Sequence, residues 1–442
     1  MNGNMLGKTE EIVKKAKDLG ADEIIAKTTL GKYRQVRFSA NEIDTTVAWN
    51  DYVTDVALAW QKRVVATQIH KFEETDLSLK KLMSLAKVSK ENPMFGGFAK
   101  GQFKYAKPQP DNALKELENP QEYVHEAVEA AKKEIGKEID SGGILFTKHE
   151  EVYIVSSEGP IGIDTRSAVE FSIRAFSQRE ASGHGIECSS TTRDFKPSRA
   201  GAKAGIIAKM AKDPKTGEEG VYDVIFDQLI YGSSLSVYGG MVSAFNVLIQ
   251  MSVFVDKLGK KVAPEIVSMR DNPASYSANN RVFDDEGTPT KENVFIDHGV
   301  LKGYLHNTST AKMFKTQTTG NAGLVAPSPW TIEMDAGDMT KDELFGEVKR
   351  GIYLTNTWYT RFQNYAKGDF STIPRDGIFL IENGEIKQSL KDLRISDNVL
   401  TMLNNVTAIS KERQQVHWWG EVDPPALSPY VLIKDVHLTK SK

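Results

Sequence analysis

The stretch QVRFSANEIDTTVAWNDYVTDVALAWQKRVVATQI (residues 35–69) decides the fold class of this chain. Apolar and polar residues alternate from Gln35 to Ala40, and two further apolar runs, at 56–60 and 64–69, flank a polar corner. A period of two puts every second side chain on one face of a strand. The stretch therefore predicts a meander of antiparallel strands with one buried face.

Helical spacing of apolar residues lies on both sides of this meander. One apolar stripe runs along Thr9–Leu19, and Gly20 follows it as a stop signal. A second stripe recurs at helical spacing around residues 79–86. Both patterns are typical of amphipathic helices that cover one face of a sheet.

The same order of elements recurs further along the chain. A helix is expected from about Pro120 to Ile139, and strands are expected at 144–146, 152–155 and 169–175. One helix followed by three strands, twice, predicts an internal duplication in the N-terminal half.

Glycine and proline punctuate the segment 92–113, which indicates a boundary between units. We therefore expect three units. They are a helix-plus-meander unit at 1–108, a second helix-plus-strands unit at 109–220, and a β-rich C-terminal domain at 221–442.

Strands predominate in the C-terminal half. Two hairpins with a turn glycine are expected at 294–305 and 378–390. Helices are expected at 340–350, which opens with a capping box, and near 396–409. Because strands arrive in groups, the sequence predicts an α+β fold with large antiparallel sheets and flanking helices.

Composition excludes several classes of protein. The 442 residues carry a formal net charge of −3, which gives no bulk electrostatic attraction to nucleic acid. The single cysteine, Cys188, excludes an intrachain disulfide. The first residues become charged before any apolar run, and the apolar run 241–255 is too short to span a bilayer. We expect a cytoplasmic protein without membrane or direct nucleic-acid binding.

No strong catalytic motif stands out from the residues alone. His125-Glu126 begins an HExxH-like pattern that has no second histidine. His184 and Cys188 lie four residues apart in SGHGIECSS, which we expect to be a loop, and His417 lies near Glu421. These two pairs leave open the alternative that the chain is a stand-alone hydrolase with a site of its own.

Four longer strings in the C-terminal half are more specific. They are FDDEGTPTKENVFIDHGVLKGYLHNTSTAKMF (283–314), TGNAG (319–323), NTWYTRFQNYAKGDFSTIPRDGIFLIENGEI (356–386) and SPYVLIKDVHLT (428–439). In this order they resemble the TldD/PmbA family, whose members are also called modulators of DNA gyrase. The resemblance implies a two-component system. TldD-type subunits are zinc metallopeptidases with an HExxxH motif, and PmbA-type (TldE) subunits lack the motif and pair with them. The active subunit cleaves unfolded or flexible peptides.

The chain departs from the TldD pattern at the metal ligands. The stretch that matches the motif, 228–254, contains no histidine, and no glutamate occurs between Val221 and Pro264. The family's third ligand is a C-terminal cysteine, whereas the comparable stretch here is VHWWGEVDPP (416–425). The resemblance therefore implies a subunit without catalytic or metal-binding residues, with zinc in a TldD-type partner.

The sequence thus predicts a PmbA/TldE-like subunit associated with a TldD-type zinc metallopeptidase. By resemblance, Asn321, Thr360, Arg361 and Asp369 are the candidate peptide-binding residues. Arg361 would pair with a peptide carboxylate or carbonyl, and a sheet edge would accept an extended peptide. Alternatively, these loops only build turns or a subunit interface. A stand-alone hydrolase and a gyrase-binding protein are the alternative functions, and a homodimer is expected when the partner is absent.

Overall fold

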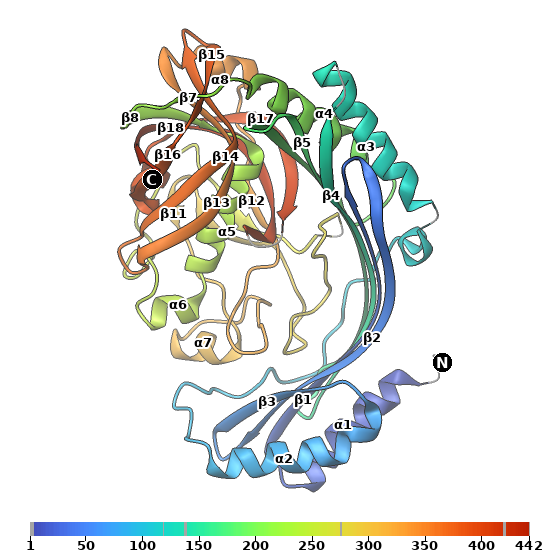
Figure 1. Cartoon of the computed structure of the whole chain (residues 1–442). Coiled ribbons are helices and arrows are strands. Elements are labelled where there is room, and N and C mark those ends of the chain that lie inside the picture. Colours follow the sequence, from blue (N-terminus) through green and yellow to red (C-terminus); the bar gives the residue numbers. More distant parts are fainter. Residues whose placement is uncertain (1–3, 118, 137–138, 275, 419–420, 442) are drawn as a thin grey trace.

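The computed structural model describes residues 4–117, 119–136, 139–274, 276–418 and 421–441. Its strands form a six-stranded sheet, in the order β3-β2-β1-β4-β5-β6, and a twelve-stranded sheet in the C-terminal half. The long strands of the first sheet curve from α1 and α2 at one end of the molecule to α3 and α4 at the other (Figure 1). The C-terminal half lies on the concave side of this curve. The fold is the α+β arrangement with large antiparallel sheets that the sequence predicts.

The six-stranded sheet joins the two expected N-terminal units. Its strands are β1 (Glu23–Ser39), β2 (Glu42–Trp60), β3 (Arg63–Ile69), β4 (Asp140–Ser156), β5 (Ile161–Gln178) and β6 (Ala181–Ser189). Each unit contributes one meander, and the two meanders meet where β1 pairs antiparallel with β4. This arrangement repeats one helix, three strands and one helix in each half of the sheet, whereas the division of the chain into three domains stays a prediction.

Three details of the predicted strands were wrong. The expected strands 144–146 and 152–155 are one strand, β4, because the polar residues between them also pair with β1 and β5. His149 and Thr147 are buried there. The segment SGHGIECSS forms β6 rather than a loop. At the start of the meander, β1 ends at Ser39, and Ala40 belongs to the turn.

Four long helices cover the six-stranded sheet. They are α1 (Met5–Asp18), α2 (Thr75–Val88), α3 (Pro120–Ile135) and α4 (Pro197–Met210). Small residues allow α3, α4 and β6 to approach closely. A Cβ on Gly201 of α4 would lie 2.0 Å from the carbonyl oxygen of Ala127 in α3, and a Cβ on Gly185 of β6 would lie 1.9 Å from that of Ala200. Side chains are therefore excluded at these contacts.

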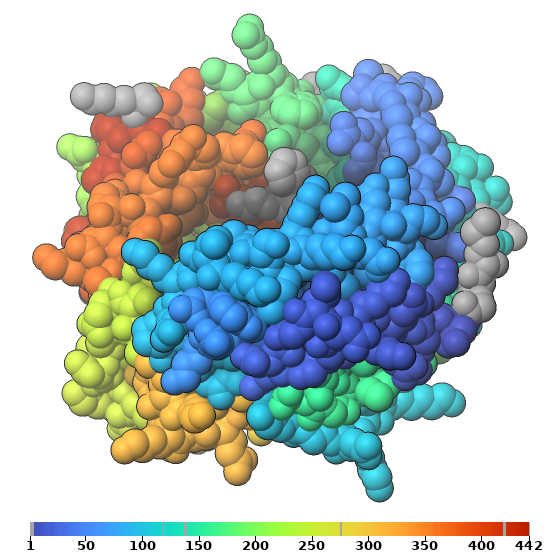
Figure 2. All heavy atoms as spheres, turned by 90° about the horizontal axis from the view of Figure 1, so that it is seen from below, coloured from blue at the N-terminus to red at the C-terminus, as the bar shows by residue number. Residues whose placement is uncertain are grey.

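The segment 92–113 follows α2 in the chain and packs between the six-stranded sheet and the C-terminal half. Gly96 N donates to Ser309 Oγ (3.0 Å), and Tyr105 OH donates to the carbonyl of Gly287 (2.8 Å). Its short helix η2 is Asn112–Glu116, and η1 (Phe72–Glu74) precedes α2. Seen from below, the surface around residues 75–105 lies alongside that of residues 250–320 (Figure 2). The segment is thus packed between the halves, and Phe98 is buried there.

The twelve-stranded sheet is built around β18. Its strands are β7 (Lys215–Thr216), β8 (Gly220–Phe226), β9 (Met269–Asp271), β10 (Asn293–Asp297), β11 (Val300–Leu301), β12 (Ile332–Met334), β13 (Arg350–Asn364), β14 (Asp369–Glu382), β15 (Glu385–Lys391), β16 (Leu393–Asn398), β17 (Val406–Trp418) and β18 (Val422–Lys440). Along its length β18 pairs with β8, β12, β16 and β17. The accompanying helices are α5 (Gln228–Met241), α6 (Ala244–Leu248), α7 (Thr308–Met313), α8 (Lys341–Gly346) and α9 (Val399–Asn404).

Both predicted hairpins are confirmed. Gly299 and Gly384 each follow a residue with positive φ, and the Asn383–Gly384 turn has φ values of 52° and 79°. The capping box at the start of α8 is also confirmed. The helix expected near 396–409 is wrong in extent, because only α9 is helical and its flanks belong to β16 and β17. Among the helices of the described residues, none is both long and apolar enough to cross a bilayer.

Candidate functional site

Helix α5 is the segment to which the resemblance assigns the zinc motif. A Cβ on Gly232 would lie 2.3 Å from Val416 Cγ2, and one on Gly239 would lie 2.5 Å from Ile332 Cγ1. The N-cap residue, Asp227, accepts from the N–H of Leu229 and pairs with Lys203 Nζ at 2.6 Å. One face of the helix therefore packs tightly against β12 and β17, and a buried carboxylate fixes its N-terminal end.

A small hollow separates α5 from the hairpin β13–β14. Ser233, Ser234 and Val237 line it from α5, and Thr360 and Thr372 line it from the hairpin. Its volume of about 30 Å³ is close to the share of one water molecule. Zinc in proteins is held by cysteine, histidine or carboxylate ligands. The neutral hydroxyl and apolar groups on this wall do not fit zinc.

The wider surroundings give the same result for metal ligands. Within the part of the chain that the structure describes, no group of three or more His, Cys, Asp and Glu side chains is placed to share a metal ion. Of the C-terminal stretch 416–425, Trp419 and Gly420 lie outside the described residues.

Three of the four candidate peptide-binding residues lie on β13 and β14. Thr360 Oγ1 donates to Thr372 Oγ1 (3.0 Å) at the wall of the hollow. The Arg361 guanidinium is exposed and lies 4.0 Å from the centroid of the Tyr359 ring. Asp369 Oδ1 accepts from Asn398 Nδ2 (2.9 Å). The hairpin brings these residues to one region beside α5, and their role in peptide binding stays a prediction.

Exposed aromatic and arginine side chains gather on the same hairpin. Trp358, Tyr359 and Tyr365 are 37%, 53% and 49% exposed. The Arg375 guanidinium lies 4.9 Å from the centroid of the Trp358 ring. Together with Arg361 we call these residues the β13–β14 patch. Trp, Tyr and Arg are the residue types enriched at the energetic centres of protein interfaces.

The fourth candidate, Asn321, is completely buried. Its Nδ2 donates to Asp271 Oδ2 (2.6 Å) and to the carbonyl of Ser328 (3.0 Å). Its Oδ1 accepts from Thr319 Oγ1 (2.7 Å) and from Asn293 Nδ2 (3.1 Å). Every hydrogen-bonding atom of the amide is therefore used inside the protein.

We expect Asn321→Ala to lower the free energy of unfolding by about 2 kcal/mol, since a buried acceptor that loses its partner costs about 1–3 kcal/mol. Burial already raises the pKa of Asp271 to about 6, despite its hydrogen bonds to Asn321 and to two backbone N–H groups. Urea denaturation measures the change. Arg361→Ala, on the exposed hairpin, is the control and should leave stability unchanged. Equal stability of the two variants would contradict this structural role.

His184 lies in a buried polar network whose hydrogen bonds do not suit a catalytic base. Its Nε2 lies 2.8 Å from Ser172 Oγ, and its Nδ1 lies 3.0 Å from Asn356 Nδ2. The Asn356 amide is oriented by Thr357 N, which donates to its Oδ1, and by Asp376, which accepts from its Nδ2. An amide donor makes Nδ1 the acceptor, so Nε2 carries the proton and donates to Ser172. A serine nucleophile needs the reverse arrangement.

The other groups considered for a hydrolase are not assembled as a nucleophile and base. Burial lowers the pKa of His184 to about 3 and raises the pKa of the Cys188 thiol, which donates to the carbonyl of Gln415 (3.3 Å). His417 Nδ1 lies 2.7 Å from Glu170 Oε1. Glu421 instead accepts a backbone N–H of β13 at 2.8 Å.

Asp376 is the centre of the network around His184 and joins the two sheets. It pairs with Arg174 Nε of β5 (2.8 Å) and accepts from Ser182 Oγ of β6 (2.7 Å) and Asn356 Nδ2 of β13 (2.8 Å). Burial alone would raise the pKa of Asp376, but Arg174, His184 and these hydrogen bonds lower it overall. No sequence signal marks this network, because its members come from two strand pairs, β5–β6 and β13–β14, that are far apart in the sequence.

The acidic string of the resemblance also has a structural explanation. Asp284 is fully buried and accepts from the backbone N–H groups of Glu286 (3.0 Å), Thr288 (2.8 Å) and Ala322 (2.9 Å). It thereby fixes the loop that presents Glu286. This loop was not predicted as a site from the sequence, although the string itself was visible.

Comparison with a family model places the chain among metallopeptidase-related proteins. A family model described as the PmbA/TldA metallopeptidase C-terminal domain matches residues 219–440, half of the chain. The chain belongs to the PmbA/TldD family.

Relatives and solved structures agree with this assignment. Metalloprotease MJ0996 from Methanocaldococcus jannaschii is 33% identical over 201 residues, which cover 44% of each chain. The chain spans about half the length of the curated relatives it matches. TldE from Thermococcus kodakarensis has a similar structure, with a TM-score of 0.87, 20% identity and coverage of 98% of this chain and 100% of that chain. A Thermotoga maritima protein, described as a candidate modulator of a DNA gyrase, has a TM-score of 0.85, 22% identity and coverage of 98% and 99%. At these identities the structures establish the shared fold.

Proposed function

We propose that this chain is a TldE-type subunit that holds no catalytic zinc and works with a TldD-type zinc metallopeptidase on unfolded or flexible peptides. The observation that carries the proposal is the wall of α5 beside the hairpin β13–β14. At the place of the family motif, this wall presents Ser233, Ser234 and Val237.

The chemistry of this wall supports a non-catalytic role. A zinc peptidase needs ligands that hold the metal and a base that removes a proton from the bound water. The segment 228–254 has neither histidine nor glutamate, and no cysteine follows Cys188.

The β13–β14 patch supports association with another protein. The hairpin that carries the patch borders α5 through Thr357 and Thr360, so a partner bound to this hairpin would lie near the family's catalytic position. Trp358 and Tyr359 offer large contact areas, and Arg361 offers charged hydrogen-bond donors for a carboxylate of the partner or of a peptide. Partner binding and peptide binding both make use of exposed side chains on this hairpin.

Reconstitution with a TldD-type subunit tests the proposal. Cleavage of an unstructured peptide should be absent with this chain alone and should require a partner with HExxxH. Elemental analysis should find far less than one zinc per chain in the isolated protein. One tightly bound zinc per chain, together with activity of the isolated chain, would contradict the proposal.

The patch can be tested in the same reconstitution. Trp358→Ala should weaken partner binding by about thirtyfold, as expected for a residue worth about 2 kcal/mol at an interface. Trp49→Ala is the matched control, because Trp49 is a tryptophan of similar exposure on the distant strand β2. Equal affinities of the two variants would place the partner elsewhere.

The alternative functions have less support. The geometry around His184 and His417 does not favour a stand-alone hydrolase, and the net charge of −3 gives no support for direct DNA contact by a gyrase modulator. The homodimer in the absence of a partner and the cytoplasmic location stay predictions. Sedimentation velocity of the isolated chain tests the first of these.

A further inference from the structure

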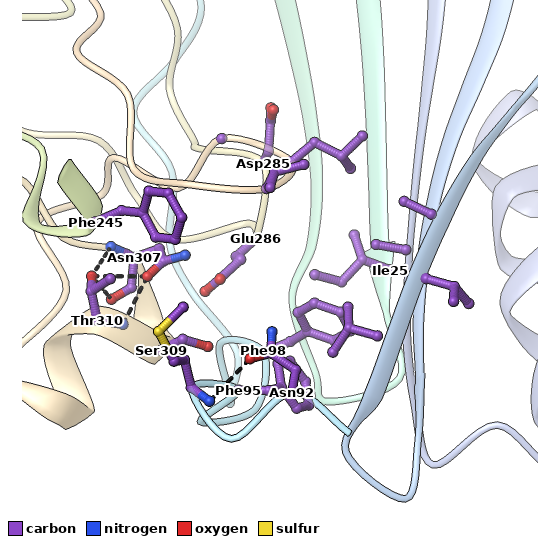
Figure 3. Close-up of a pocket in the computed structure, with 18 of the residues that line it drawn as sticks. Ile25, Asn92, Phe95, Phe98, Phe245, Asp285, Glu286, Asn307, Ser309 and Thr310 are labelled. Carbon is purple, nitrogen blue, oxygen red and sulfur yellow. Dashed lines mark hydrogen bonds between the residues drawn. The ribbon is translucent and has the colours of Figure 1, made fainter. Parts of the chain in front are cut away.

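A cavity of about 400 Å³ lies between the six-stranded sheet and the C-terminal half. Its walls come from segments that are far apart in the sequence (Figure 3). The sheet contributes Ile25 and Ala66, the connecting segment contributes Phe95 and Phe98, and α6 contributes Phe245. Cavities that bind small organic molecules usually measure about 300–1,000 Å³ and have mostly apolar walls with a few polar groups. This cavity has both properties.

The charged groups of the lining are all acidic. Within the part of the chain that the structure describes, the lining contains Asp285 and Glu286 but no lysine, arginine or histidine. The two carboxylates differ in direction. The Glu286 side chain points toward Asn307 and Ser309 across the cavity, whereas Asp285 points away from it (Figure 3).

Asp285 already has a cationic partner. Its Oδ1 lies 2.9 Å from Lys27 Nζ, and Lys27 also lies 3.2 Å from Asp55 Oδ2. Among the described residues, the donors to Glu286 are neutral groups of Thr308 and the backbone N–H of Ala99. Glu286 Oε2 accepts from the hydroxyl and the backbone N–H of Thr308. A carboxylate beside an apolar cavity is poorly solvated, and burial raises the pKa of Glu286 to about 7. A cation bound in the cavity would supply a positive charge next to the Glu286 carboxylate.

We propose that this cavity binds an organic monocation, with its ammonium group paired to Glu286 and its apolar body between Phe95, Phe98 and Phe245. The Thr308 donors hold the carboxylate in place, and the nearby aromatic rings favour a cationic or apolar guest. A free aromatic amine and the N-terminal residue of a peptide share this chemistry. The proposal is independent of the TldE-type function, because the cavity and the hollow beside α5 share no lining residue.

Titration calorimetry with 2-phenylethylamine tests the charge pairing. Wild-type protein should bind one molecule per chain, at least about tenfold more tightly than 2-phenylethanol, in which a hydroxyl replaces the ammonium group. Glu286→Gln should remove this preference, because the amide still accepts from Thr308 but carries no charge. Asp285→Asn is the matched control. It removes the neighbouring charge, which points out of the cavity, and should retain the preference.

A second variant tests the location without altering charge. Ala66 is exposed on β3 and lines the cavity. Ala66→Phe should fill the space and abolish binding of both compounds while the melting temperature stays unchanged.

Binding of phenylalanine amide, but not of N-acetylphenylalanine amide, would extend the site to peptide N-termini. Phenylalanine amide that fails to bind while 2-phenylethylamine binds would support the free amine as the source. No binding of the amine at about 5 mM, equal binding to Glu286→Gln, or binding that survives Ala66→Phe would overturn the proposal.

Discussion

Gly201→Ala is expected to lower the free energy of unfolding by about 3 kcal/mol. The added Cβ would lie 2.0 Å from the oxygen, 2.7 Å from the carbonyl carbon and 2.8 Å from the Cα of Ala127. These are backbone atoms, so α3 and α4 would have to separate. On its other side α4 is held against β6, where Gly185 meets Ala200. Overpacking of this kind typically costs about 1–3 kcal/mol, and here three backbone atoms resist it.

The sign of this effect distinguishes packing from helix propensity. Alanine is favoured over glycine inside a helix by about 1 kcal/mol. Gly240→Ala in α5 is the matched control, because among the described residues no heavy atom outside its chain neighbours and its own helix backbone lies within 4 Å of the position that its Cβ would take. It should leave stability unchanged or raise it. Urea denaturation of both variants measures the difference, and a Gly201 variant as stable as the Gly240 variant would refute the close contact of the helices.

Asp376→Ala is expected to cost about 3–5 kcal/mol, the usual loss when one partner of a buried ion pair is removed. The substitution leaves the Arg174 guanidinium unpaired and takes an acceptor from Ser182 and Asn356. Thermal and urea unfolding measure the loss. The control is Glu385→Ala, which breaks a solvent-exposed pair with Lys387 and should have no measurable effect. A loss no greater than in this control would show that the network does not hold the sheets together.

The lowered pKa of Asp376 predicts that the stability of the protein depends on pH in the acidic range. The folded protein lowers the pKa of Asp376 below its ordinary value of 3.8. Its contribution to stability is therefore complete above about pH 4 and is lost as the pH falls through the lower folded pKa. In Asp376→Asn this part of the acid dependence should disappear. Melting temperatures between about pH 3 and 7 would show it as a flatter curve.

Local patterns predicted much of the fold. The meander around 35–69 and the two hairpins follow from alternation and turn residues, both of which depend on neighbours in sequence. Strand β6 was missed because Gly183 and Gly185 are typical of loops. In the structure these glycines make room for the backbone of α4. A local pattern cannot show that a helix from another segment will lie against a strand.

The surroundings of the candidate residues could be predicted only in part, for a similar reason. The resemblance singled out Thr360 and Arg361, but only the structure places Thr360 beside α5. The resemblance could not show that Asn321 is enclosed, since its partners Asp271 and Ser328 come from separate loops. Glu286 illustrates the same limit. Its string was visible in the sequence, but the cavity beside it exists only where the sheet and the connecting segment meet.

The pairing of β1 with β4 has a consequence for fragments of this protein. The two strands are hydrogen-bonded partners from Ile25 opposite Ser156 to Phe38 opposite Gly143. A truncation at residue 108 would strip β1 of this partner and leave a long row of unsatisfied amide and carbonyl groups in water. Such an edge recruits other chains. Fragments cut there should precipitate or form domain-swapped assemblies, whereas a protease nick in the connecting segment should leave two pieces that elute together.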